Sequence, residues 1–195
     1  TRLNHMVARV VETELPLIYL NMVGGQDDQV FDGASFALNP GGKLAFQMPA
    51  FDAQVAHVDL EQTAEGWRII EGEKAHLPPE YEQDYRVMVH GLRDYMGKTG
   101  FKKVLLGLSG GVDSAIVATI AVDALGADNV RCVMLPSEYT SQASLDDAET
   151  VAKALGCQYD YVPISKGRAA ITETLAPLFE GTKPDLTEEN IQSRL

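Results

Sequence analysis

Short apolar runs separated by turn residues dominate the first third of the chain. Runs of strand type cover residues 17–22, 30–38, 43–48 and 54–60. The segments between them, such as 24–28 and 39–42, are rich in Gly, Pro, Asn and Asp, the residues that supply tight turns. The pattern predicts an antiparallel or mixed β region between residues 17 and about 70.

A charged stretch and two consecutive prolines interrupt this pattern. Pro78 and Pro79 lack backbone N–H donors and favour extended backbone. We therefore expect a domain boundary here, with one domain in residues 1–76 and a second in residues 77–195.

The second domain has the spacing of helices alternating with buried strands. Apolar side chains recur at three- and four-residue steps from Tyr81 to Tyr95, which predicts an amphipathic helix that ends near Gly97. Buried strands are then expected at 103–108, 130–135 and 158–164, and helices at 112–125 and 144–155, each helix ending before a glycine. Strand, helix, strand, helix, strand predicts an α/β fold with a parallel sheet.

Composition limits the classes of function. The chain has 195 residues and 45% hydrophobic content, enough for one or two globular domains. The chain has 16 Lys and Arg and 28 Asp and Glu, which gives a net charge of -12. Because this charge repels a phosphate backbone, nucleic acid is a poor candidate partner.

The apolar runs and the two ends of the chain bear on the cellular location of the protein and on whether the chain is a fragment. No run approaches the roughly 18 apolar residues that a membrane span needs, and the first residues lack the pattern of a signal peptide. We expect a cytoplasmic protein without membrane contact. The chain starts without Met and stops inside an apparent helix at residues 192–195, so we expect a fragment of a longer protein.

The two cysteines do not form a metal-binding or disulfide pattern. Cys132 and Cys157 lie in apolar or strand-like sequence, without a CxxC or Cys/His spacing. We interpret both as thiols of the core.

One loop carries the candidate chemistry. The eight residues concerned are Gly107, Leu108, Ser109, Gly110, Gly111, Val112, Asp113 and Ser114. They join the first strand of the α/β domain to its helix, at the carboxyl edge of the sheet, where open parallel sheets bind ligands. Adjacent glycines let the backbone approach an anion, and the start of the helix directs N–H groups toward it. The loop is therefore predicted to bind phosphate.

Asp113 sets this loop apart from better-known phosphate loops. No lysine follows the glycines, as Walker A requires, and the GxGxxG spacing is also absent. A carboxylate beside phosphates is repulsive unless a cation lies between them, and Mg²⁺ accepts one or two carboxylates together with phosphate oxygens. Asp113 is therefore the predicted Mg²⁺ ligand.

A purely structural interpretation of the loop is a tight turn followed by helix capping by Asp or Ser. A run of Ser, Gly, Gly, any residue, Asp, Ser arises by chance on the order of once in a million positions at average residue usage. Its position between a strand and a helix further favours the phosphate loop.

With these residues, the chain resembles a family of ATP-using enzymes. Ser109 to Ser114 after an apolar strand resembles the signature of the enzymes that split ATP between the α- and β-phosphates, which include NAD, GMP and asparagine synthetases and tRNA thiolation enzymes. Residues 135–148 and 187–194 resemble NAD synthetases in particular, although the commonest family form has Ala where Ser193 stands. Residues 19–33 resemble the later part of the nitrilase-like glutaminase domain that is fused to bacterial NAD synthetases.

The resemblance implies a reaction and roles for single residues. In the family, ATP adenylates the nicotinate carboxylate of deamido-NAD, pyrophosphate leaves, and ammonia from glutamine displaces AMP. By resemblance Ser109, Gly110, Gly111 and Ser114 hold the ATP phosphates, and Arg194 contacts deamido-NAD. The segment from Leu135 to Tyr139 is a candidate part of the adenine pocket, although turn formation explains Ser137 and Tyr139 equally well.

The resemblance also limits what this chain contains. The glutaminase triad of Glu, Lys and Cys lies upstream of the matching segment in the family, so no catalytic residue is assigned here. A homo-oligomer is expected from the family. Two alternatives remain open at this point: another adenylating enzyme with the same loop, and a nucleotide-binding module without turnover.

Overall fold

The computed structural model describes residues 2–179. The chain separates into two compact units, Thr1–Gly100 and Phe101–Leu195. The helix α2 (Glu80–Thr99) belongs to the first of these units. The division into family domains at residues 76 and 77 stays a prediction.

The first unit is built on a three-stranded antiparallel sheet. Its order is β1 (Leu17–Tyr19), β4 (Phe36–Asn39), β5 (Lys43–Gln47), and the 3-10 turn η1 (Pro40–Gly42) joins the last two strands. The central strand β4 is buried along its whole length. The predicted antiparallel β region is therefore confirmed.

Helix α1 (Arg2–Thr13) covers this sheet and was not predicted. It buries Val10 against Phe36 and Leu38, with Met6 and Val7 packed beside them. Leu3, Met6, Val7 and Val10 have the i, i+3, i+4, i+7 spacing of an amphipathic helix, so the sequence carried a signal for α1 that was overlooked.

Two hairpins complete the first unit: β2 (Val23–Gln26) with β3 (Gln29–Asp32), and β6 (Leu60–Thr63) with β7 (Gly66–Ile69). The predicted strand at 54–60 is wrong, because only Leu60 of that run enters a strand. The predicted turn at 24–28 is correct only for Asp27 and Asp28, since residues up to Gln26 belong to β2.

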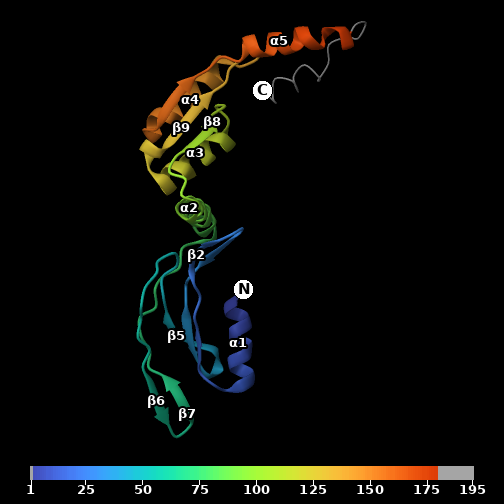
Figure 1. The fold of residues 1–195 in the computed structure, drawn as a ribbon. Coiled ribbons are helices and arrows are strands. Elements are labelled where there is room, and N and C mark those ends of the chain that lie inside the picture. The colour runs from blue at the N-terminus through green and yellow to red at the C-terminus, as the bar shows by residue number, and fades with distance from the viewer. Residues whose placement is uncertain (1, 180–195) are drawn as a thin grey trace. The chain divides into compact units, whose positions relative to one another are not determined.

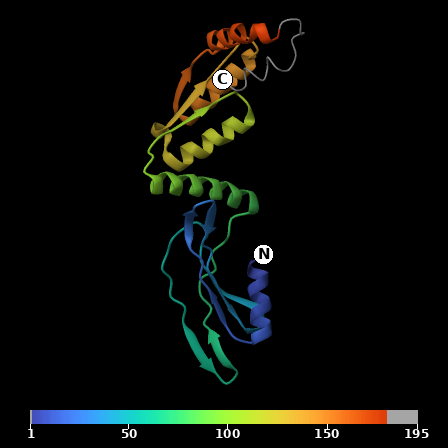
Figure 2. The same ribbon diagram turned by 45° about the vertical axis from the view of Figure 1, so that its right-hand side comes forward.

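The glycines of β2 are explained by α2 rather than by a turn. Asp94 of α2 accepts a hydrogen bond of 2.6 Å from the backbone N–H of Gly25. A Cβ on Gly24 would stand 2.7 Å from the same carboxylate. Figure 2 shows α2, in green, running across the β2–β3 hairpin.

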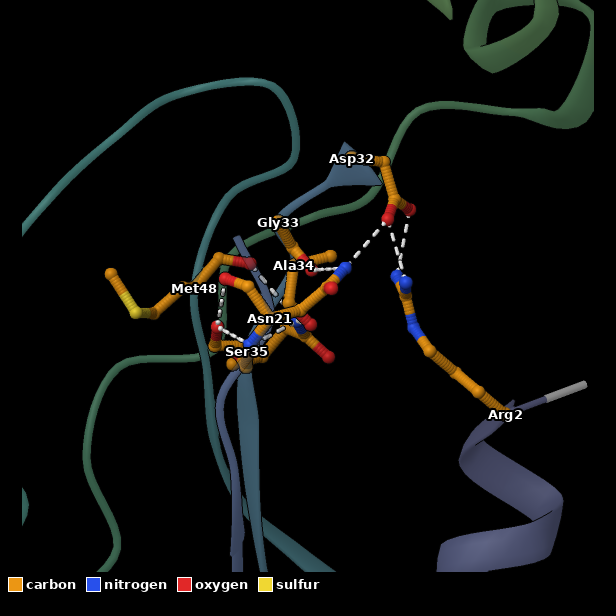
Figure 3. A network of polar contacts seen from close by, with 8 residues as sticks. Arg2, Asn21, Asp32, Gly33, Ala34, Ser35 and Met48 are labelled. Carbon is orange, nitrogen blue, oxygen red and sulfur yellow. Dashed lines mark hydrogen bonds and ion pairs between the residues drawn. The ribbon is translucent and has the colours of Figure 1, made fainter. Parts of the chain in front are cut away.

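A polar network fixes the start of α1 to the end of β3. Figure 3 shows Arg2 reaching Asp32, and its guanidinium donates hydrogen bonds of 2.6 and 2.7 Å to the two carboxylate oxygens. The amide of Asn21 donates to Asp32 at 3.0 Å and to the carbonyl of Gly33 at 2.9 Å. The backbone N–H of Asn21 donates to the Ser35 hydroxyl at 2.9 Å. These bonds stabilise the segment that resembles the glutaminase domain.

The second unit contains the predicted parallel sheet, with the order β10 (Gln158–Tyr161), β9 (Val130–Met134), β8 (Val104–Gly107) (Figure 1). Helices α3 (Val112–Leu125) and α4 (Gln142–Leu155) lie side by side and contact the sheet. The short turn η2 (Ala127–Asn129) follows α3. These elements confirm the predicted α/β class.

Two details of this unit differ from the predictions. Helix α5 (Ser165–Leu175) and the turn η3 (Ala176–Leu178) were not predicted. Strand β8 was expected to be buried, yet Leu105 is 68% exposed. Within residues 101–179 the helices that contact β8 leave this side chain uncovered, since successive side chains point to opposite faces of a sheet.

No helix within residues 2–179 combines the length and the apolar character needed to cross a membrane.

Candidate functional site

The predicted phosphate loop lies between the end of β8 at Gly107 and the start of α3 at Val112. Gly110 has a φ of +81°, a conformation that side chains rarely adopt. A Cβ at this position would stand 2.2 Å from the carbonyl oxygen of Ser144 in α4. The loop therefore needs glycine both for its backbone conformation and for its contact with α4.

The two serines of the loop stabilise its shape. The Ser114 hydroxyl donates to the carbonyl of Gly111 at 2.9 Å and accepts from the backbone N–H of Ser109 at 3.2 Å. The Ser109 hydroxyl accepts from the Gly111 N–H at 3.3 Å and lies 3.1 Å from the Ser114 hydroxyl. Since the loop residues bond to one another, its conformation is organised before any ligand arrives.

The amino terminus of α3 suits an anion. The residue that precedes it, Gly111, has no side chain, so the N-cap position supplies no side-chain hydrogen bond to the first turn. The first N–H groups of a helix lack partners inside the helix, and the helix dipole favours negative charge beside them. Phosphate oxygens bound there would replace the missing cap.

Asp113 is exposed in the first turn of α3. Within residues 2–179, no group of three or more His, Cys, Asp or Glu side chains gathers to hold a metal ion by itself. Asp113 therefore fits as a ligand of an Mg²⁺ ion that is also bound by substrate phosphates. Mg²⁺ commonly binds through one or two carboxylates together with phosphate oxygens.

A cleft of about 470 Å³ adjoins the loop. Three residues of the predicted loop line it, Gly107, Leu108 and Ser109, while the other five loop residues continue into α3. The remaining lining comes from the end of β9 and the segment that leads into α4: Val133, Met134, Leu135, Tyr139, Thr140, Ser141 and Ser144. Its volume is in the range of small-molecule sites.

The segment after β9 forms a turn and also lines the cleft. Ser137 forms a turn, because its backbone N–H donates to the Thr140 hydroxyl at 3.1 Å and its own hydroxyl accepts from the Tyr139 N–H at 3.2 Å. Tyr139 and Leu135 line the cleft. The turn therefore presents these two side chains to the cleft.

Thr140, Ser141 and Ser144 were missed as site residues. Helix α4 begins at Gln142, two residues before the predicted start, and Ser141 caps it by accepting a hydrogen bond of 3.1 Å from the Ser144 N–H. The spacing of these two serines is a cap signal that could have placed the start correctly. Arg194 and the whole segment 187–194 lie outside the described residues.

The cysteines are neighbours across the second unit. Both are free, and the Sγ atoms of Cys132 and Cys157 lie 3.6 Å apart. Cys132 is buried, as predicted, whereas Cys157 is only partly buried. Burial, together with the adjacent Cys157 thiol, raises the pKa of Cys132 to about 12.

A sequence model described as "NAD synthase" matches residues 84–195, more than half of the chain. The chain belongs to the NAD synthase family. The match includes the loop and every lining residue of the cleft.

Individual NAD synthetases agree with this assignment. The chain is 63% identical to a glutamine-dependent NAD(+) synthetase of Rhodobacter capsulatus, over 96% of this chain and 34% of that protein. It is 36% identical to the Thermotoga maritima protein of the same name, over 100% of this chain and 39% of that one. The chain thus spans little more than a third of the length of these relatives.

A solved structure extends the likeness to three dimensions. The glutamine-dependent NAD⁺ synthetase from Acinetobacter baumannii, determined in complex with ADP, superimposes with a TM-score of 0.92 and 37% sequence identity. The match covers 99% of this chain and 36% of the Acinetobacter chain. Both the β-rich unit and the α/β unit therefore have counterparts in an NAD synthetase.

Proposed function

We propose that this chain supplies the ATP-binding part of a glutamine-dependent NAD(+) synthetase. The whole enzyme converts deamido-NAD to NAD through an adenylated intermediate, with release of pyrophosphate and AMP. The observation that carries the proposal is the loop from Ser109 to Ser114, which adjoins a cleft of suitable size at the carboxyl edge of a parallel sheet.

ATP would lie with its phosphates on the loop and its base toward Leu135 and Tyr139. The serines and the α3 amino terminus would hold the β- and γ-phosphates. A carboxylate that attacks the α-phosphate must overcome repulsion between like charges, so catalysis here is mainly orientation and neutralisation of charge. The loop is suited to orientation, because its hydrogen bonds fix its conformation. The amino terminus of α3 and a bound Mg²⁺ would neutralise charge.

Asp113 is the residue that would hold Mg²⁺ on the ATP phosphates. A bound Mg²⁺ supplies positive charge that stabilises the departing pyrophosphate. The exposed position of Asp113 beside the loop supports this role.

The remaining substrates and partners are proposed from the family. Deamido-NAD would contact Arg194, and glutamine hydrolysis elsewhere in the whole enzyme would supply ammonia. We also propose a homo-oligomer in the cytoplasm. The alternative of another adenylating amidotransferase is less well supported, because the β-rich unit also matches the glutamine-dependent NAD(+) synthetase structure.

A product analysis with the full-length enzyme tests this function. ATP labelled at the α- or γ-phosphate is incubated with ammonia, with and without deamido-NAD. The expected products are AMP and pyrophosphate, formed only when deamido-NAD is present. Formation of ADP, or of no product, would exclude the ligase and favour another ATP-binding function.

The Asp113→Asn variant tests the metal role in the same assay. Because the neutral amide binds Mg²⁺ poorly, the rate should fall by about 100-fold or more. Asp128→Asn, which changes an exposed carboxylate in η2, is the matched control and should keep the normal rate. An Asp113→Asn enzyme with an unaltered rate would refute the role.

A further inference from the structure

The wall of the cleft formed by the segment after β9 is tied to the segment after β10. The backbone N–H of Val162 donates to the carbonyl of Met134 at 2.9 Å, and the N–H of Ile164 donates to that of Pro136 at 3.0 Å. These bonds bring the first turn of α5 beside residues 137–139.

Arg168, in that first turn, contacts two successive residues of the segment after β9, of which Tyr139 lines the cleft. Its guanidinium forms an ion pair with Glu138 and lies over the ring of Tyr139, 5.1 Å from the ring centroid. A planar guanidinium can donate to a carboxylate in its plane and stack on an aromatic face at the same time, which an ammonium cannot do.

Burial makes these two contacts more important than those of an ordinary surface pair. The Arg168 side chain is only 15% exposed. Its Nε atom is buried and has no hydrogen-bond partner within residues 2–179. Removal of Glu138 would leave a largely buried positive charge with fewer partners, which is costly.

Tyr139, in contrast, is 59% exposed and lines the cleft. A ring with that exposure is not held by a hydrophobic core. Its orientation depends on the local turn at Ser137 and on the guanidinium of Arg168.

We propose that Arg168 is a positioning residue for ATP binding, which holds Glu138 and Tyr139 so that the segment after β9 forms the base-side wall of the cleft. The inference rests on the proposed function, because it requires ATP in this cleft. Arg168 does not itself line the cleft. Its effect is transmitted through Tyr139.

Equilibrium dialysis of radiolabelled ATP against the full chain tests the proposal. Arg168→Met removes the charge and the planar stack but keeps an apolar stem, and it should raise the Kd for ATP about tenfold. Arg168→Lys keeps the charge without the planar group and should show an intermediate Kd. Lys166→Met, an exposed cation of the same helical turn, is the matched control and should bind like the wild type.

A charge exchange separates positioning from general loss of structure. The double variant with Glu138→Arg and Arg168→Glu restores opposite charges and should recover part of the affinity lost in either single variant. In the full-length enzyme, Arg168→Met should raise the KM for ATP and leave kcat and the KM for deamido-NAD near their normal values. Far-UV circular dichroism checks that each variant is folded.

The outcomes distinguish the two proposals. If the wild type binds ATP and folded Arg168→Met binds it with the same Kd, the positioning role is overturned and the proposed function stays intact. Parallel loss of kcat and of affinity for both substrates would also overturn it, because it would indicate a structural role. Failure of the wild type to bind ATP would refute the ATP site and with it this inference.

Discussion

Gly110 and Ser144 meet at the point where the phosphate loop touches the first turn of α4. A Cβ on Gly110 would stand 2.2 Å from the Ser144 carbonyl oxygen and 2.8 Å from its Cα. The contact joins the two segments that line the cleft. Any displacement of one segment therefore moves the other.

Substitution Gly110→Ala should greatly weaken ATP binding, because the methyl group can be accommodated only if the loop or α4 moves. Gly156→Ala is the matched control: its φ of +70° gives similar backbone strain, but its Cβ would meet nothing within 4 Å. Both variants should lose about 1 kcal/mol or more of unfolding free energy. Dialysis with labelled ATP should show a loss of affinity for Gly110→Ala alone, and equal loss in both variants would contradict this contact.

Substitution Ser114→Ala should lower ATP affinity about tenfold, because the hydroxyl joins Ser109 and Gly111 across the loop. Thr119→Val, which removes a hydroxyl that donates to the Ala115 carbonyl of the same helix, is the control. Titration calorimetry measures both. Unchanged affinity in Ser114→Ala would show that the loop does not depend on this hydroxyl.

The thiol of Cys132 should be inert in the folded chain. A pKa raised to about 12 keeps it protonated at pH 8, and the thiolate is the reactive form. Labelling with iodoacetamide followed by peptide mass analysis should modify Cys132 only after unfolding in urea. Native labelling of Cys132 at the rate of a free cysteine would contradict its burial.

Glu71 provides a test of charge in the first unit. Hydrogen bonds from Lys43 and then Lys74 lower the pKa of Glu71 from 4.5 to about 2. Because this carboxyl pKa is lowered in the folded state, the contribution of Glu71 to folding stability is complete above pH 4.5 and is lost as the pH falls toward 2. NMR titration of the Glu71 side chain should show this midpoint, and a double Lys43→Gln, Lys74→Gln variant should return it toward 4.5. A wild-type midpoint near 4.5 would show that the two lysines are not bound to it in solution.

Local signals were sufficient for the three strands, α3 and the phosphate loop of the α/β unit, but not for α5 or the start of α4. Helix α3 was predicted with its observed bounds because glycines stand on both sides of it, at Gly111 and Gly126. The loop was recognisable because its glycines, serines and Asp113 occur together between a strand and a helix.

Other features depend on contacts between distant residues and were missed for that reason. A strand at 54–60 would need a partner strand, and none pairs with residues 54–59 within the described residues. The alternation of apolar and polar positions does not indicate whether a partner exists. The glycines of β2 were interpreted as a turn because their true cause, Asp94, lies in α2. Arg168 and Glu138 are 30 positions apart in the sequence, so no local pattern indicates that they form an ion pair.

The most direct test of the ATP site is an NMR titration of the ¹⁵N-labelled chain with ATP and Mg²⁺. The account predicts that amide shifts concentrate at residues 109–114 and 139–144, and that omission of Mg²⁺ weakens those near Asp113. Saturable shifts confined to other residues, or no shifts at millimolar ATP, would contradict the assignment of the loop as an ATP site.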